Sequence, residues 1–117
     1  MPEHEKINYV EFPAKDFTKT KEFFNTVFGW SFEEFGEEYM AFSNAGLDGG
    51  FIKSDHHSDT NTGAALIVFY SEQLDQTEIK IKSSGGTIVK PIFSFPGGRR
   101  FHFTDPNGNE LAVWSDL

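Results

Sequence analysis

The 117-residue sequence contains no cysteine, and this absence excludes several kinds of site. Without thiols the chain forms no disulfide, binds no metal through thiolate and carries no cysteine nucleophile. Structural disulfides belong to oxidising compartments, so a cysteine-free chain is typical of the reducing cytoplasm. We therefore expect a cytoplasmic protein.

Positive charge and long apolar runs are also scarce. The chain has 10 Lys and Arg residues against 18 Asp and Glu, a formal net charge of −8, and a negative surface repels the phosphates of nucleic acids. No apolar run approaches the roughly 20 residues that cross a bilayer. The polar start MPEHEKINYV lacks the apolar core of a signal peptide. The sequence thus predicts neither a nucleic-acid partner nor a membrane segment.

Common catalytic and nucleotide-binding motifs are missing as well. The chain has no Gly-x-Ser-x-Gly elbow, no Walker loop and no dinucleotide-binding fingerprint. The glycine pairs at 49–50, 85–86 and 97–98 instead indicate turns or close approaches of the backbone. What the chain has in abundance is aromatic side chains, with 14 Phe, three Tyr and two Trp. Large rings bury much surface per residue, so residues 1–117 are expected to form one domain with one core.

Two successive parts of the chain show the same order of predicted elements: a strand, a helix and three strands. In the first part the strands are expected at 7–12, 30–35, 39–43 and 49–53, with a helix at 17–28. In the second part they are expected at 64–70, 87–93, 99–104 and 110–114, with a weaker helix at 74–82. Asp16 is suited to cap the first helix and Gly29 to end it.

The two parts align at a shift of 57 residues, which places Phe17 on Leu74 and Gly29 on Gly86. An internal duplication is the simplest cause. The predicted fold class is therefore α+β, with two βαβββ modules at about 5–54 and 64–117. Residues 54–63 contain no apolar side chain and are expected to link the modules.

Three segments resemble one known family. The opening INYVEFPAKDFTKTKEFFNTVFGW, the segment SSGGTIV and the closing FHFTDPNGNELAVW resemble the glyoxalase/bleomycin-resistance/dioxygenase, or vicinal oxygen chelate, superfamily. The resemblance extends from Ile7 to Trp114. It implies that the modules join their sheets into a curved trough, the usual ligand site, with helices outside. The family includes lyases, isomerases, dioxygenases and metal-free antibiotic-sequestering proteins, so the fold alone does not select a function.

The resemblance also implies four positions for metal ligands, on the first and last strands of each module. They fall on Tyr9, within 49–52, on Leu66 and on Ala112. Leu and Ala have no donor atom, and a neutral Tyr is a poor ligand. We therefore expect no metal site and no cofactor. The alternative is a divalent metal held by a rearranged set of ligands.

Three side chains are candidates for catalysis, although no catalytic residue is assigned. Glu11 and Glu110 lie two residues from the implied ligand positions, so strand alternation turns them toward the trough. The alternative for each is a rim carboxylate paired with Arg99 or Arg100. His102 is a candidate acid–base group if the neighbouring Phe side chains face the helix. Its alternative is an exposed histidine on the polar face of a strand.

The leading hypothesis is a metal-free trough that binds a small, partly aromatic or apolar molecule, either to sequester it or to transform it without a metal. The predicted lining consists of Tyr9, Glu11, Leu66, Val68, Glu110, Ala112 and Trp114. One alternative is a metal-dependent lyase, isomerase or dioxygenase, and another is a non-catalytic interaction subunit. By resemblance we also predict a homodimer, with Trp30, Phe32 and Phe35 as candidates for a covered patch. Whether one chain or two build the trough stays open at this point.

Overall fold

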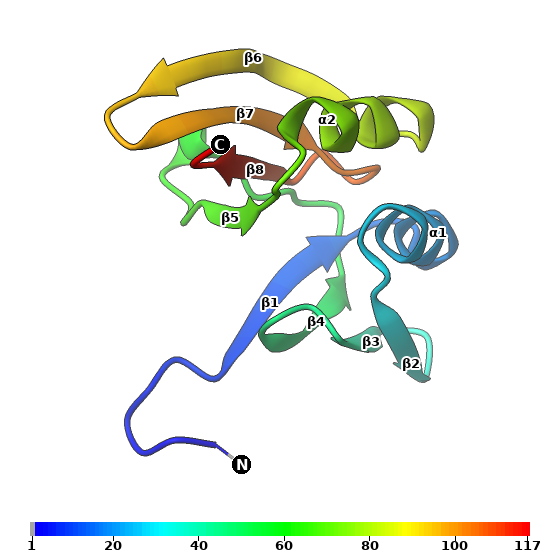
Figure 1. Ribbon diagram of the computed structural model, residues 1–117. Coiled ribbons are helices and arrows are strands. Elements are labelled where there is room, and N and C mark those ends of the chain that lie inside the picture. Colours follow the sequence, from blue (N-terminus) through cyan, green and yellow to red (C-terminus); the bar gives the residue numbers. More distant parts are fainter. Residues whose placement is uncertain (1) are drawn as a thin grey trace.

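The computed structural model describes residues 2–117 and confirms the fold class, with two βαβββ modules (Figure 1). The first module contains β1 (Tyr9–Ala14), α1 (Phe17–Phe28), β2 (Ser31–Phe35), β3 (Tyr39–Ser43) and β4 (Asp48–Lys53). A short 3-10 turn, η1 (Thr60–Thr62), lies between the modules. The second module contains β5 (Ile67–Tyr70), α2 (Leu74–Ser83), β6 (Thr87–Phe95), β7 (Gly98–Thr104) and β8 (Glu110–Ser115).

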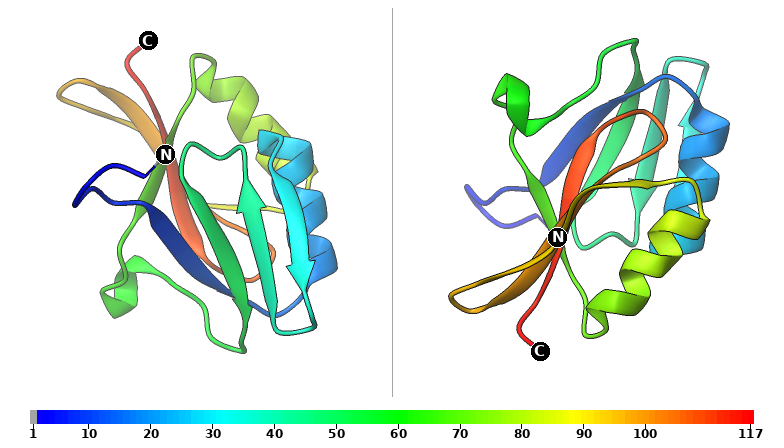
Figure 2. Two further views of the ribbon diagram at one scale, coloured as in Figure 1. Left: turned by 90° about the horizontal axis from the view of Figure 1, so that it is seen from below. Right: turned by 90° about the horizontal axis from the view of Figure 1, so that it is seen from above.

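Each module forms its own four-stranded mixed sheet. The strand orders are β1-β4-β3-β2 and β5-β8-β7-β6. In both sheets the first strand runs parallel to the last, and the remaining pairs are antiparallel. The view from below in Figure 2 shows the first sheet broad side on, with β1 at one edge and β2 at the other.

The two helices differ in how firmly the sequence defines them. Asp16 caps α1, its Oδ1 atom accepting a hydrogen bond from the Lys19 N–H at 3.0 Å, and Gly29 ends the helix with φ of 74°. Gln73, at the start of α2, makes no side-chain cap. Five residues of α1 are buried and only two of α2, so α1 contributes more to the core.

One aromatic core joins the modules, and one face of α1 contributes to it. Phe24 packs on Phe51 of the first sheet, with ring centroids 5.6 Å apart. From the same helix, Phe28 packs on Phe69 of the second sheet at 4.1 Å. The expected arrangement, with helices on the outer faces of a shared trough, is therefore not what a single chain shows. The reason is that α1 is aromatic toward both sheets.

A polar contact fixes the modules at one end of this core. The turn between β7 and β8 lies against the start of α1. Asn107 accepts a hydrogen bond from the Lys15 N–H at 2.9 Å and donates one to Thr20 Oγ1 at 2.8 Å. Asn109 donates to the carbonyl oxygen of Pro13 at 2.8 Å. Both asparagines are buried, so these bonds define how the second module sits on the first.

The face of each sheet that points away from the core is called its free face below. Because side chains alternate along a strand, Phe12 enters the core while Tyr9 and Glu11 lie on the free face of the first sheet. In the second sheet Phe69 enters the core and Val68 lies on the free face. The shared core therefore separates the two free faces within one chain. Within residues 2–117, neither helix is long and apolar enough to cross a membrane.

Candidate functional site

A tyrosine–glutamate cluster occupies the free face of the first sheet. The Tyr39 hydroxyl donates to Glu11 Oε2 at 3.0 Å and lies 2.5 Å from the Tyr9 hydroxyl. Since Tyr39 uses its one hydrogen toward Glu11, Tyr9 donates to Tyr39. Burial and the hydrogen bonds to Tyr9 and Glu11 raise the pKa of Tyr39 above its ordinary value. The structure thus brings together two predicted residues, Tyr9 and Glu11, through a third.

Tyr39 was missed by the sequence analysis, but one signal pointed toward it. Its ring lies over Gly50, and a Cβ atom there would be 2.4 Å from the Tyr39 ring. The Gly49–Gly50 pair had indicated a close approach. The partner was not predictable, because β3 pairs with β4 in a register that the sequence does not display.

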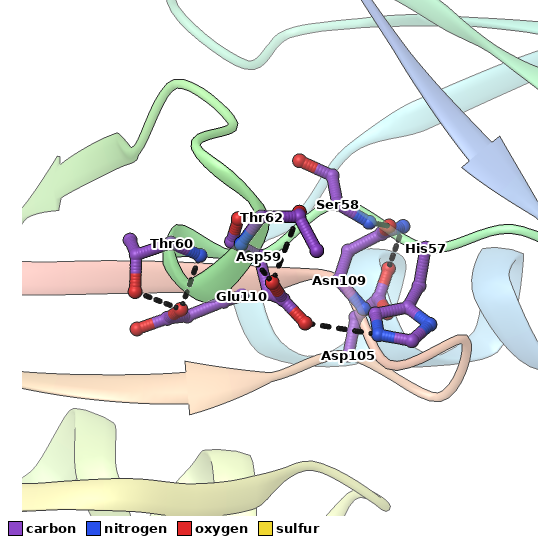
Figure 3. A network of polar contacts seen from close by, with 8 residues as sticks. All are labelled: His57, Ser58, Asp59, Thr60, Thr62, Asp105, Asn109 and Glu110. Atoms are coloured by element: carbon purple, nitrogen blue, oxygen red, sulfur yellow. Dashed lines mark hydrogen bonds and ion pairs between the residues drawn. The ribbon is translucent and has the colours of Figure 1, made fainter.

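A buried histidine–glutamate pair lies on the free face of the second sheet. His102 Nδ1 is 2.8 Å from Glu110 Oε2, and the side chains are only 4% and 10% exposed. The other carboxylate oxygen of Glu110 accepts from the N–H and the hydroxyl of Thr60, at 2.9 and 2.7 Å (Figure 3). Burial opposes ionisation, but the bonds from Thr60 and His102 lower the pKa of Glu110 to about 2.

The ionised carboxylate decides the state of the imidazole. Glu110 accepts, so His102 Nδ1 must carry the hydrogen and donate. His102 Nε2 is buried and has no hydrogen-bond partner within the described residues. Two alternatives from the sequence are wrong: Glu110 does not pair with Arg99 or Arg100, and His102 is not exposed. Phe101 and Phe103 enter the core, so His102 lies on the opposite face, where it packs beside Glu110.

The segment between the modules holds Glu110 in place (Figure 3). Ser58 accepts from the Glu110 N–H at 2.7 Å, and its own N–H donates to Asn109 Oδ1 at 2.8 Å. Asp59 caps η1 by accepting from the Thr62 N–H at 3.0 Å. The linker therefore docks on β8, and Thr60 is a site residue that the sequence analysis missed. Only the tertiary structure brings Thr60 to Glu110, 50 residues away.

An aromatic row with one arginine extends along the same free face. The guanidinium carbon of Arg100 lies 5.4 Å from the Phe93 ring centroid and 5.9 Å from that of Phe95. The ring of Trp114, a predicted lining residue, has its centroid 6.5 Å from that of Phe95 and 5.2 Å from that of Tyr70. The sequence analysis missed Phe95 because it ended the strand at residue 93, whereas β6 continues to Phe95.

The other predicted lining residues differ in how far they are exposed on the free face of the second sheet. Val68 is 42% exposed and pairs with Ala112, which is fully buried. Leu66 is half-buried just before β5. An apolar cavity of about 330 Å³ lies between the modules and reaches Val68, and a polar one of about 380 Å³ reaches Glu110 and Lys90. Neither cavity joins Tyr9 to Trp114, so the predicted lining is divided between two free faces.

The residues at the four implied metal-ligand positions do not fit a metal centre. Tyr9 is hydrogen-bonded to Tyr39, Gly50 has no side chain, and Ala112 has no donor atom. Within residues 2–117, no three His, Asp or Glu side chains gather around one point. A divalent cation needs several converging oxygen or nitrogen ligands. We therefore derive no chemistry through a metal ion.

Solved structures with the same fold come from several bacteria. The fosfomycin resistance protein FosX from Listeria monocytogenes superposes with a TM-score of 0.78 at 22% identity, covering 95% of this chain and 93% of FosX. A glyoxalase/bleomycin resistance protein/dioxygenase family enzyme from Burkholderia phytofirmans PsJN gives 0.77 at 16% identity, covering 94% and 98%. Lactoylglutathione lyase from Agrobacterium tumefaciens gives 0.72 at 17% identity, covering 95% and 93%.

At these identities the structural likeness establishes the fold and not the activity. No curated protein matches the sequence. The family profile, by contrast, matches nearly the whole chain, over residues 6–113. This match agrees with the element order and with the closing turn, and the chain belongs to the Glyoxalase/Bleomycin resistance protein/Dioxygenase superfamily.

Proposed function

We propose that this protein binds a small, partly aromatic or apolar molecule between two copies of the chain, at a site without a metal ion. The division of the predicted lining residues carries the proposal. Tyr9 and Glu11 lie on the free face of the first sheet, and Glu110 and Trp114 lie on that of the second. Since the aromatic core separates these faces, one chain cannot close a trough between them, whereas two chains can.

The surfaces of the free faces support such pairing. Ile52 and Phe35 on the first sheet are 43% and 55% exposed, and Tyr70 on the second is 49% exposed. Large exposed apolar side chains mark interaction surfaces. The first face carries the acidic Glu11, and the second carries Arg100, which has no salt-bridge partner within the described residues. When the first free face of one chain packs against the second free face of another, a twofold axis repeats the contact. The result is a closed homodimer with two equivalent troughs.

The structure revises which of the three aromatic residues predicted for the dimer contact are exposed. Trp30 is 5% exposed, because it stacks on Phe24 at 4.4 Å inside its own chain. Phe32 is half-buried, and Phe35 remains exposed on the first free face. The proposed dimer contact therefore includes Phe35 and excludes Trp30.

The structural neighbours offer a precedent for small ligands in this fold. FosX from Listeria monocytogenes has been solved, as an E126Q mutant, with Mn(II) and 1S,2S-dihydroxypropylphosphonic acid. The donor set described above does not suit such an ion. We therefore carry over the small ligand and not the metal, and we propose that cytoplasmic sequestration or conversion of that ligand is the protein's role.

Sedimentation at micromolar concentration tests the dimer. We expect wild type to be a dimer and Ile52→Asp to be a monomer, because the variant places a charge on the first free face. The matched control is Ile79→Asp, since Ile79 is 62% exposed on α2, outside both free faces. Circular dichroism confirms that each variant is folded. A wild-type monomer would contradict the shared trough.

Elemental analysis and titration with Mn²⁺, Zn²⁺, Ni²⁺ and Fe²⁺ test the metal-free site. We expect no stoichiometric ion in the purified dimer. One tightly bound ion per chain, lost in Glu11→Ala or Glu110→Ala, would make a metal-dependent lyase, isomerase or dioxygenase the better hypothesis.

A second candidate function is metal-independent proton transfer by His102. The observation that favours it is the free Nε2 atom of His102, opposite an Nδ1 atom held by ionised Glu110. Such a carboxylate fixes the tautomer of a histidine that accepts protons. Once a ligand is found, His102→Gln should abolish turnover while binding persists. A folded dimer that binds no small molecule would instead favour the interaction subunit.

A further inference from the structure

Arg100 has an unusual environment for a surface arginine. It lies on the free face of the second sheet, between Trp114 on β8 and Phe93 on β6. Within residues 2–117 its guanidinium forms no salt bridge, and its buried Nε atom has no hydrogen-bond partner. Arg99, its neighbour in sequence, reaches Asp75 at 3.8 Å and the Leu117 carbonyl at 3.5 Å.

The absence of a partner is notable in a chain with 18 acidic and 10 basic residues. Two acidic side chains near this face are already engaged. Glu110 binds His102 and Thr60, and Asp116 accepts the Tyr70 hydroxyl at 2.5 Å. The positive guanidinium has no acidic partner within the described residues, so it is able to pair with an anion supplied from outside. Among the residues that the structure describes, two buried side-chain atoms lack a partner, Arg100 Nε and His102 Nε2, and both lie on this face.

The surroundings of Arg100 indicate which anion would bind. Phe93 and Phe95 lie within cation–π distance of the guanidinium, and its planar fork of N–H donors suits a carboxylate. Trp114 and Tyr70 lie next in the row, with rings 5.2 Å apart and 68° between their planes. Tyr70 is half exposed, so its ring offers a surface on which another ring packs.

We propose that this row is a subsite for an aromatic carboxylate, with the carboxylate at Arg100 and the ring against Trp114 and Tyr70. The inference rests on the proposed function and names the class of its ligand. Arg100 anchors the anion in this arrangement. Phe93 and Phe95 are positioning residues, because they orient the guanidinium.

Calorimetric titration of the intact protein with 2-naphthoate and with its neutral amide, 2-naphthamide, tests the subsite. The two probes have nearly the same shape, so their difference isolates the charge. We expect the carboxylate to bind about tenfold more tightly than the amide, since a charge-assisted bidentate contact is at stake. Arg100→Gln should remove that preference, so that the variant binds the two probes about equally.

Two further variants make the result specific. Arg99→Gln changes the net charge equally and should keep the preference, because Arg99 is bound to Asp75 and Leu117. Arg100→Lys keeps the charge without the planar fork and should retain only part of it. This milder variant also serves if Arg100→Gln does not fold.

The remaining outcomes separate this inference from the proposed function. Equal wild-type affinity for both probes overturns the carboxylate subsite while leaving small-molecule binding intact. Failure of both probes at millimolar concentration overturns the subsite and counts against the proposed function. Dissociation of the dimer by Arg100→Gln but not by Arg99→Gln would show that Arg100 pairs with a carboxylate of a second copy, which also overturns the subsite.

Discussion

The two modules share one backbone plan and differ in the side chains that their free faces carry. Both pair the first strand parallel to the last and the others antiparallel. The first free face carries an exposed tyrosine–glutamate cluster around Gly50. The second carries an aromatic row, an arginine and a buried histidine–glutamate pair. Free faces lie outside the core, so their side chains can diverge without changing the strand order.

The two helices also differ, but they differ in how much of each enters the core. Five residues of α1 are buried, against two of α2. Phe23 extends from α1 to the second sheet and lies 6.1 Å from Phe103. The first helix thus serves both modules, whereas the second serves mainly its own sheet.

Phe23→Ala should produce the largest effect and tests that asymmetry. Phe23 is 1% exposed, so truncation leaves a cavity between the modules. We expect a loss of about 3–5 kcal/mol in the free energy of unfolding, measured by denaturant titration. The matched change in α2, Ile79→Ala, should cost at most about 0.5 kcal/mol, because Ile79 is 62% exposed. Similar losses in both variants would contradict the unequal roles of the helices.

Glu110→Gln should produce the next largest effect and tests the buried pair on the second free face. The folded protein lowers the pKa of Glu110 from 4.5 to about 2. Because the folded value lies below the unfolded one, the carboxylate stabilises the fold above about pH 4.5, and this contribution disappears as the pH falls toward 2. At pH 7 we expect Glu110→Gln to lose roughly 2–3 kcal/mol of unfolding free energy. The difference from wild type should shrink as the pH falls from 4.5 to 2.

Glu11→Gln is the matched control on the first free face. Glu11 is exposed and accepts one hydrogen bond from Tyr39. We expect a change of at most about 0.5 kcal/mol and an acid-unfolding curve parallel to that of wild type. If the Glu11 and Glu110 variants behaved alike between pH 2 and 7, the hydrogen bonds of Glu110 to His102 and Thr60 would not contribute what the structure indicates.

Much of the fold was predictable because its signals are local. The signals that bound each element lie within a few residues of it. Asp16 caps the start of α1, the left-handed Gly29 ends that helix, and a turn follows β7 directly. Phe23, Phe24 and Val27 recur at helical spacing, and that pattern alone indicates the buried side of α1. The packing of α1 between two sheets was not predictable, because it depends on which rings of the second module meet Phe28.

The candidate site was predictable only in part, for the same reason. Strand alternation correctly placed Glu110 and His102 on one face, but not their mutual bond, which needs the register of β7 against β8. Thr60 lies in a segment without periodicity, and no pattern connects it to Glu110. Phe95 was assigned to a turn, because Pro96 and Gly97 follow it. Contacts between distant segments therefore account for most of what the sequence did not show.

The last comparison concerns how the two helices begin, where modest changes in stability are expected. Asp16 accepts the Lys19 N–H at the start of α1, whereas Gln73 at the start of α2 makes no cap although its backbone is also non-helical. Asp16→Ala should therefore cost about 1 kcal/mol of unfolding free energy. Gln73→Asp should instead add a few tenths of a kcal/mol, up to about 1, by supplying the missing acceptor at the positive end of the helix dipole. Thermal and denaturant unfolding measure both changes. No gain from Gln73→Asp would mean that packing on the second sheet, and not the missing cap, limits α2.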